Sequence, residues 1–116
     1  MKVRLPKGVG GGPQNMDAMM RQVQKFQEER EALAADLESR EYDVAAGGGA
    51  VNLKIDGSLR VTEIKIESEI IDPDDPETLE DIIVAAVNEG IKRVQDASAS
   101  EMSALAAKYG IPDGAF

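Results

Sequence analysis

The stretch that decides the fold is residues 41–67, EYDVAAGGGAVNLKIDGSLRVTEIKIE. Apolar and polar side chains alternate in two of its runs, 42–46 and 51–55, and three consecutive glycines separate these runs. Alternation with a period of two is typical of a strand with one buried face. A third run, Leu59 to Glu67, follows Asp56-Gly57, a dipeptide that is favoured in hairpin turns. The stretch therefore predicts an antiparallel meander of three short strands.

The third run changes phase along its length. Its apolar positions are first Leu59 and Val61 and then Ile64 and Ile66, so the alternation skips one residue. Two interpretations stay open: a β-bulge near Thr62–Glu63, or a strand that is covered on both faces at this point.

A long helix is predicted upstream of the strands, from about residue 15 to 38. Asn15 can cap its first turn. Apolar or semi-apolar residues then recur at intervals of three, four and seven, the seam of a heptad pattern, at Met16, Met19, Val23, Phe26, Leu33 and Leu37. At ~1.5 Å per residue such a helix is over 30 Å long. Residues 1–14 are rich in glycine and carry Lys2, Arg4 and Lys7, which predicts a flexible basic tail.

A second helix is predicted downstream, opening at Asp74-Asp75-Pro76. Acidic capping residues and a proline in the first turn are typical of a helix start. Its apolar positions include Leu79, Ile83 and Val87, and we expect it to end before Gly110. The chain is thus one domain over residues 15–107, followed by a short tail, 108–116.

These elements make an α+β protomer in the order α-β-β-β-α, with an antiparallel three-stranded sheet flanked by two long helices. So small a sheet cannot cover both helices, and its edges stay open. A second copy related by a two-fold axis solves both problems, so we predict an obligate homodimer. The residues expected to pack in the dimer or between the helices are Met16, Met19, Val23, Phe26, Leu79, Ile83 and Val87.

The net charge of −9, from 13 basic and 22 acidic residues, is distributed unevenly. Residues 1–27 hold five bases and one acid, whereas residues 28–116 hold eight bases and twenty-one acids. Eight acids and no base lie within residues 67–81. Taken alone, the net charge argues against nucleic acid as a partner, but the basic first quarter favours an anionic partner.

Catalytic chemistry has little support in this sequence. The chain has no His and no Cys, so it lacks the commonest acid/base group, thiol nucleophile and zinc ligands. The acidic run at Asp72–Ile83 begins like a calcium loop but lacks the required glycine and the final Glu. We expect no cofactor, metal or small-molecule substrate and no membrane span or signal peptide, so a cytoplasmic protein is predicted. A metal-dependent enzyme built on the acidic cluster stays open as a remote alternative.

The candidate ligand-binding residues are therefore basic. Arg21 and Lys25 lie four residues apart on one helical face, just after the basic tail. Lys92-Arg93 is the only adjacent basic pair. Because aromatic residues are not interleaved with these bases, contact with a duplex backbone is favoured over stacking on single-stranded bases.

Three segments resemble the YbaB/EbfC family of bacterial nucleoid-associated proteins. They are NMDAMMRQVQKFQEE, EYDVAAGGGAVNLKIDG and IIDPDDPETLEDIIVAAVNEGIKRVQ, and the two chain ends, MKVRLPKGVGGGPQNM and IPDGAF, are similar to those of some members. The specific part is the glycine triplet between strands together with DPDDPETLEDIIVAAVNE. Gly90 departs from the family pattern, in which a helix-favouring alanine is usual; it is expected to cost up to ~1 kcal/mol unless it permits close helix approach.

The resemblance implies a small cytosolic homodimer whose sheets meet at the centre and whose paired helices project like tweezers. It also implies binding to double-stranded DNA in the nucleoid with little sequence preference, through the matching positions Arg21, Lys25, Lys92 and Arg93. With Lys2, Arg4 and Lys7 these residues form the predicted DNA-binding set, and binding is expected to be weak to moderate and salt-dependent. The alternative is a protein-binding adaptor dimer that serves a replication or repair partner.

Overall fold

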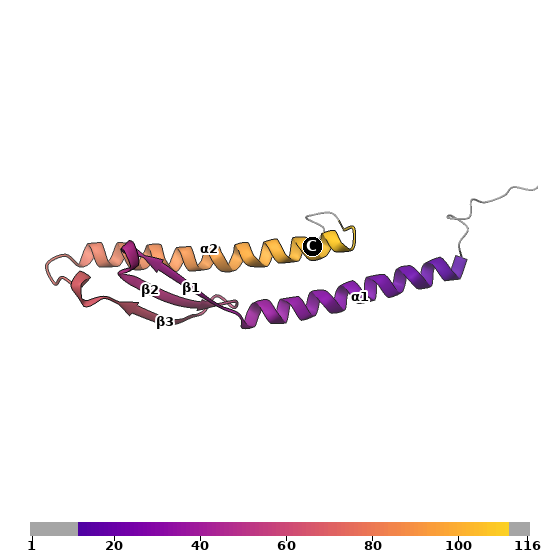
Figure 1. The fold of residues 1–116 in the computed structure, drawn as a ribbon, viewed down its shortest axis with the longest axis horizontal. Helices are drawn as coiled ribbons and strands as arrows, with labels where there is room; N and C mark the ends of the chain where they lie inside the picture. Colours follow the sequence, from indigo (N-terminus) through magenta and orange to yellow (C-terminus); the bar gives the residue numbers. More distant parts are fainter. Residues whose placement is uncertain (1–11, 112–116) are drawn as a thin grey trace, which may run out of the picture.

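The chain forms two long helices around a three-stranded antiparallel sheet, in the order α1, β1, β2, β3, α2 (Figure 1). This computed structural model describes residues 12–111. The elements are α1 Gly12–Ser39, β1 Glu41–Ala46, β2 Val51–Asp56, β3 Val61–Ile66 and α2 Pro76–Lys108. Short 3-10 turns at Gly47–Gly49 and Ser68–Ile70 follow β1 and β3. The α+β class and the element order predicted from the sequence are confirmed.

The first helix begins earlier than predicted. It starts at Gly12, so Asn15 lies inside the helix and does not cap it. Proline in the first turn of a helix costs no hydrogen bond, because the amide groups there have no partner within the helix. A Gly/Pro-rich sequence therefore does not prevent the helix from starting at residue 12. Residues 1–11 of the predicted tail lie outside the described residues.

The strand β3 contains the predicted bulge. Lys54 is opposite Glu63, but the next residue of β2, Ile55, is opposite Val61, which leaves Thr62 as the extra residue. The bulge preserves the side-chain alternation, so Val61, Ile64 and Ile66 share one face of the sheet with the buried residues of β2.

β2 and β3 form the hairpin predicted at Asp56-Gly57, but its loop is longer than a two-residue turn. β3 begins at Val61 and not at Leu59, and Leu59 itself has a positive φ of 66°. The Asp56 carboxylate accepts hydrogen bonds from the backbone amides of Ser58 and Arg60, which stabilises a longer loop. Gly57 has another role: a Cβ there would lie 1.7 Å from the carbonyl oxygen of Leu37. The absence of a side chain at Gly57 lets the loop pack against the end of α1.

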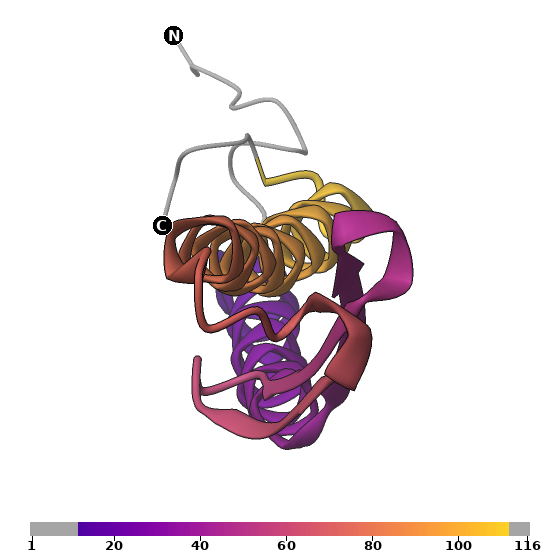
Figure 2. The same ribbon diagram turned by 90° about the vertical axis from the view of Figure 1, so that its left-hand side faces the viewer.

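The core lies between the sheet and α2. Val51, Leu53 and Ile55 of β2 are buried beneath this helix, together with Ala86 and Val94. Gly90 is buried at the same contact, and a Cβ there would lie 3.2 Å from Ile55 and 3.3 Å from Leu53. Gly90 therefore permits the close helix approach that the sequence left open. We call the three strands with residues 76–96 of α2 the body (Figure 2).

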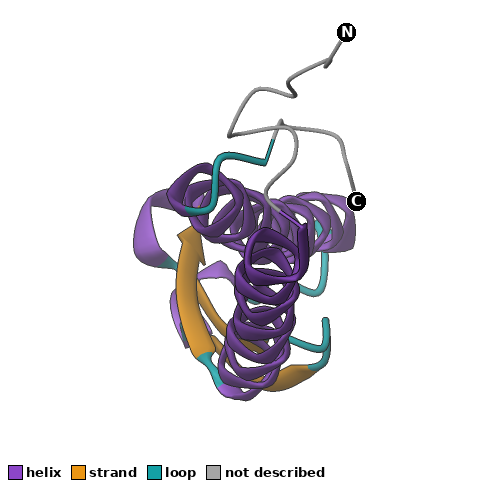
Figure 3. Ribbon diagram, turned by 90° about the vertical axis from the view of Figure 1, so that its right-hand side faces the viewer, coloured by secondary structure: helices purple, strands orange, loops and turns teal. Residues whose placement is uncertain are grey.

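The remaining helical segments form an arm, defined as α1 together with residues 97–111. Within the arm α1 runs antiparallel to the end of α2, and its first turns project beyond that end (Figures 1 and 3). Phe26 packs edge-on against Tyr109 with ring centroids 5.4 Å apart, and Leu37 is buried near the body. Beyond Phe26, every side chain from Asn15 to Lys25 is exposed.

The residues predicted to pack have different environments in the single chain. Leu79 and Val87 pack against the core of the body, and Ile83 is half-buried. Met16, Met19 and Val23 are exposed on the arm.

Candidate functional site

The basic residues of the arm are open to solvent. Arg21 and Lys25 are exposed, and neither forms an ion pair with another residue among the described 100. Both come before Phe26, which contacts Tyr109 at the end of α2, and the first turns of α1 project beyond that end (Figure 3). Two accessible cations one helical turn apart can contact neighbouring phosphates.

The basic pair of α2 is engaged within the chain. The ammonium group of Lys92 lies 2.7 Å from the carboxylate of Asp96, one turn along the helix, and this contact raises the pKa of Lys92. The guanidinium group of Arg93 donates a hydrogen bond to the backbone carbonyl of Asp43 in β1. Both side chains remain exposed, but part of their hydrogen-bonding capacity is used by the body.

The structure does not bring the two predicted basic pairs together in one chain. Arg40 at the end of α1 meets Glu101, and from this contact α1 leads back toward the arm tip, whereas the earlier turns of α2 lead into the body (Figure 1). At ~1.5 Å per residue, Arg21 and Lys92 are separated by about 40 Å along the helix axes. Lys2, Arg4 and Lys7 lie outside the described residues, and they directly precede the arm in the sequence.

The acidic residues gather at the other end of the molecule. The segment 67–81, with its eight acids, links β3 to the first turn of α2, at the end opposite the arm tip (Figure 1). Two of these acids have structural roles: Asp75 caps α2 by accepting from the amide of Thr78, and Asp72 accepts from the amide of Asp74. Among the described residues, the arm tip, residues 12–27, holds two bases and one acid, so its charge differs in sign from that of the acidic end.

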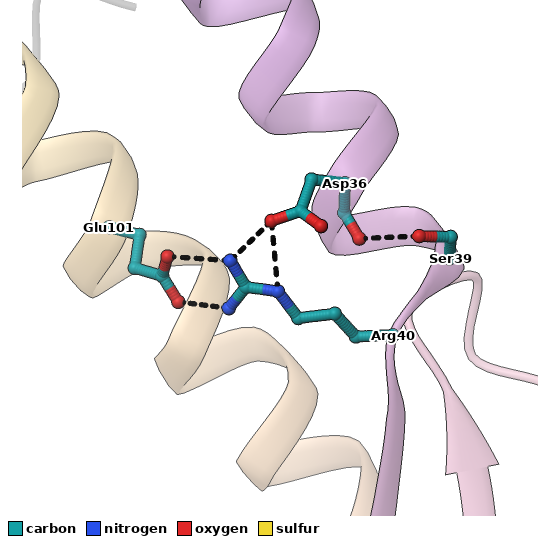
Figure 4. A network of polar contacts seen from close by, with 4 residues as sticks. All are labelled: Asp36, Ser39, Arg40 and Glu101. Carbon is teal, nitrogen blue, oxygen red and sulfur yellow. Dashed lines mark hydrogen bonds and ion pairs between the residues drawn. The ribbon is translucent and has the colours of Figure 1, made fainter.

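Arg40 holds the C-terminal end of α1 against α2. Its guanidinium group donates to the carboxylates of Asp36, in the last turns of α1, and Glu101, in α2 (Figure 4). The two carboxylates raise the pKa of Arg40, and Arg40 in turn lowers the pKa of Glu101. The spacing of Asp36 and Arg40 could have suggested a pair within the helix. The contact with Glu101 spans 61 residues and has no local sequence signal.

A second polar cluster holds the end of α2 against α1. The carboxylate of Glu29 accepts hydrogen bonds from the Tyr109 hydroxyl and, at 3.1 Å, from the ammonium group of Lys108. These bonds lower the pKa of Glu29, while the neighbouring carboxylate raises the pKa of Tyr109 to about 12. The sequence does not predict this cluster, because its members are far apart in the chain and leave no local signal.

Other kinds of site find no support between residues 12 and 111. This part of the chain contains no group of three or more metal-ligating residues placed to hold an ion. It also contains no helix that is both long enough and apolar enough to cross a bilayer.

The chain is similar to bacterial nucleoid-associated proteins. Residues 11–109 match the YbaB/EbfC DNA-binding family. A nucleoid-associated protein of Clostridium acetobutylicum is 41% identical over 105 residues, which cover 90% of this chain and 92% of that protein. A nucleoid-associated protein of Alkaliphilus oremlandii is 46% identical over 103 residues, covering 89% of this chain and 90% of that protein.

A solved structure has a similar fold. The crystal structure of an uncharacterized protein from Helicobacter pylori matches with a TM-score of 0.53 and 20% sequence identity. The match covers 65% of this chain and 87% of that chain. At this level of identity the likeness concerns the fold alone.

Proposed function

Because the chain belongs to the YbaB/EbfC DNA-binding family, which is not a family of enzymes, we propose that it binds duplex DNA as a homodimer. Its place of action is the nucleoid in the cytoplasm, where it affects nucleoid organisation and gene expression. The observation that carries the proposal is the projecting arm, on which Arg21 and Lys25 are exposed and form no ion pair with the described part of the chain.

The arm contacts the DNA backbone rather than the base edges. Arg21 and Lys25 neutralise phosphates, and the basic residues Lys2, Arg4 and Lys7 extend the same positive region along the sequence. Such contacts release counterions and carry no sequence information, so binding weakens steeply with salt and has little sequence preference. Lys92 and Arg93 contribute a second, weaker contact, because each already has a partner within the chain.

The acidic end restricts how the duplex can approach. Residues 67–81 lie at the end of the protomer opposite the arm tip, so phosphates are repelled there and attracted by Arg21 and Lys25 near the tip. The same acidic excess lowers the overall affinity, which fits a protein that binds DNA moderately.

The second copy covers the uncovered part of the sheet. α2 packs chiefly on β1 and β2, whereas Val61 and Ile64 of the edge strand β3 are 45% and 41% exposed on the same face. Ile71 and Val84 add exposed apolar surface. Contact between two copies through this surface removes it from water and closes the β3 edge. The arms then project in pairs, and each dimer presents two sets of basic residues to DNA.

The DNA contact is tested by charge reversal on the arm. We expect Arg21→Glu with Lys25→Glu to lower the affinity for a duplex by about tenfold or more, and the slope of log affinity against log salt to fall by about two per protomer. Arg60→Glu with Lys65→Glu is the matched control, because it makes the same change of charge on exposed positions of the body. A mobility-shift titration over a salt series measures both quantities.

A second candidate function is a protein-binding adaptor for a replication or repair protein. It is favoured by the exposed apolar side chains Met16, Met19 and Val23 on the arm. If the arm variant and the body control bind DNA equally well, the phosphate contact at the arm is wrong and the adaptor becomes the better proposal. Replacing the three apolar residues with serine then abolishes partner binding.

The dimer is tested on β3. Ile64→Asp places a charge in the proposed interface and is expected to convert the dimer to a monomer in sedimentation equilibrium. Lys65→Asp alters the neighbouring residue on the opposite face of the strand and is expected to leave the dimer intact. Circular dichroism of both variants separates loss of the dimer from loss of the fold. A monomeric wild-type chain contradicts the homodimer.

A further inference from the structure

The arm contains an apolar groove of about 510 Å³ between α1 and the end of α2. Its lining includes Met19, Val23 and Phe26 from α1, with Tyr109 and Ile111 from the other side. Arg30 is the only charged residue in the lining. The groove belongs to neither the basic pair Arg21 and Lys25 nor the β3 surface, so the DNA-binding proposal leaves it unassigned.

The end of α2 directs the chain back over this groove. Gly110 has a φ of 71°, and the amide of Ile111 donates a hydrogen bond of 2.8 Å to the carbonyl of Ala106. A left-handed glycine followed by this bond is the Schellman motif, which ends a helix and reverses the chain direction. Ile111 consequently lies at the lip of the groove instead of continuing the axis of α2.

The length of chain that follows matches the length of apolar surface that is still open. Tyr109 faces Phe26, and in the ten residues before Phe26, Met16 to Lys25, the apolar seam of α1 is exposed and has no partner among the described residues. Those ten residues of helix span about 15 Å. Five further residues, Pro112 to Phe116, reach at most about 17 Å when extended.

We propose that residues 112–116 dock in this groove of their own arm, with the Phe116 ring packed against Met19 and Val23. The sequence of the segment suits this role. Pro112 prevents a helical continuation, Asp113 brings a negative charge toward Arg30, and Phe116 is the one large apolar residue in the segment. A ring against a methionine sulfur is a favourable contact beyond simple burial. Docking shields the methionine seam of the arm from other partners.

The methionines themselves provide the test. Met19 and Met20 are similarly exposed in the described residues, 66% and 68%, but only Met19 lines the groove. In the full chain treated with hydrogen peroxide, Met19 is expected to form its sulfoxide roughly twofold or more slowly than Met20, because oxidation follows exposure. Phe116→Asp is expected to equalise the two rates, whereas Phe116→Leu keeps the difference. Mass spectrometry of the peptide that contains both residues measures the ratio.

Equal rates in the wild-type chain, or a ratio that Phe116→Asp leaves unchanged, overturn the proposal. A disulfide experiment distinguishes the chain's own groove from that of a second copy. The chain has no cysteine, so Val23→Cys with Ala115→Cys introduces one defined pair. An intrachain disulfide under mild oxidation supports docking as proposed, and an interchain disulfide contradicts it. Neither measurement involves DNA, so each outcome is independent of the DNA-binding proposal.

Discussion

The body and the arm of this protein are stabilised in different ways. In the body, α2 covers β1 and β2, and Val51, Ile55 and Ala86 are completely buried. In the arm, Leu37 is the only large apolar side chain that is buried among the described residues. In the arm, polar contacts hold α1 against the end of α2 instead. One involves Arg40 with Glu101, and the other involves Glu29 with Lys108.

The difference indicates a division of roles. Burial of apolar side chains fixes the geometry of the body, since it is the main favourable contribution to folding. The arm is held by exposed ion pairs, which contribute little to stability. Because it buries few side chains, most of them stay accessible to partners. The arm, which we propose to contact DNA, is thus attached to a body whose buried core fixes the fold.

The largest expected effect is the contrast between a core residue and an arm residue of similar size. Ile55 is completely buried, so Ile55→Ala is expected to lower the free energy of unfolding by about 2–5 kcal/mol. Met20→Ala removes a side chain that is exposed in the described residues and does not line the groove, so it is expected to cost under ~0.5 kcal/mol. Urea denaturation followed by circular dichroism measures both.

A cost for Met20→Ala that approaches that of Ile55→Ala contradicts the proposed division, because the arm then contributes a core of its own. Met19→Ala is expected to have an intermediate cost that depends on Phe116, because residues 112–116 are proposed to cover Met19.

A smaller effect is expected at the contact between α2 and the sheet. Alanine favours a helix over glycine by about 1 kcal/mol, but a Cβ at Gly90 meets Ile55 and Leu53 at 3.2–3.3 Å. Both neighbours are buried, and we expect the packed core to resist the small shift that a Cβ requires, so Gly90→Ala is expected to lower the free energy of unfolding by about 1 kcal/mol. Asn88→Ala, on the exposed side of the same helix, is the control and is expected to raise it slightly. If Gly90→Ala stabilises the protein, the helix and sheet have room to separate.

The body could be predicted from the sequence because its signals are local. Alternation in β2, the phase shift at Thr62 and the capping residue Asp75 each depend on neighbours within a few positions, and all three are found in the structure. Features of the body that depend on distant residues are the ones the sequence does not predict. The hairpin at Asp56-Gly57 is found, but its loop is longer than a two-residue turn, and the packing of Gly57 against Leu37, twenty residues away in the chain, has no local signal.

The arm could be predicted only in part. The heptad seam of α1 indicated a helix with an apolar stripe, and the helix is present. Its partners were not predictable, because Arg40 with Glu101 and Glu29 with Lys108 are separated by 61 and 79 residues. The basic pairs matched the family pattern by residue type, yet the pattern could not show that Lys92 and Arg93 already have partners in the body.

The smallest expected effect tests the polar contact at the end of the arm. The hydrogen bond to Glu29 raises the pKa of Tyr109 to about 12, from an ordinary value of 10.0. A raised pKa means that this contact stabilises the arm fully below pH 10 and is lost as the pH rises through about 12. In a Tyr42→Phe background, where Tyr109 is the only tyrosine, Glu29→Gln is expected to return its pKa toward 10, measured by tyrosinate absorbance. Tyr42→Phe is a suitable background because the buried Tyr42 hydroxyl has no hydrogen-bond partner. If Tyr109 titrates near 10 with Glu29 in place, the end of α2 is not held against Glu29 of α1 in solution, and the arm is open at this end.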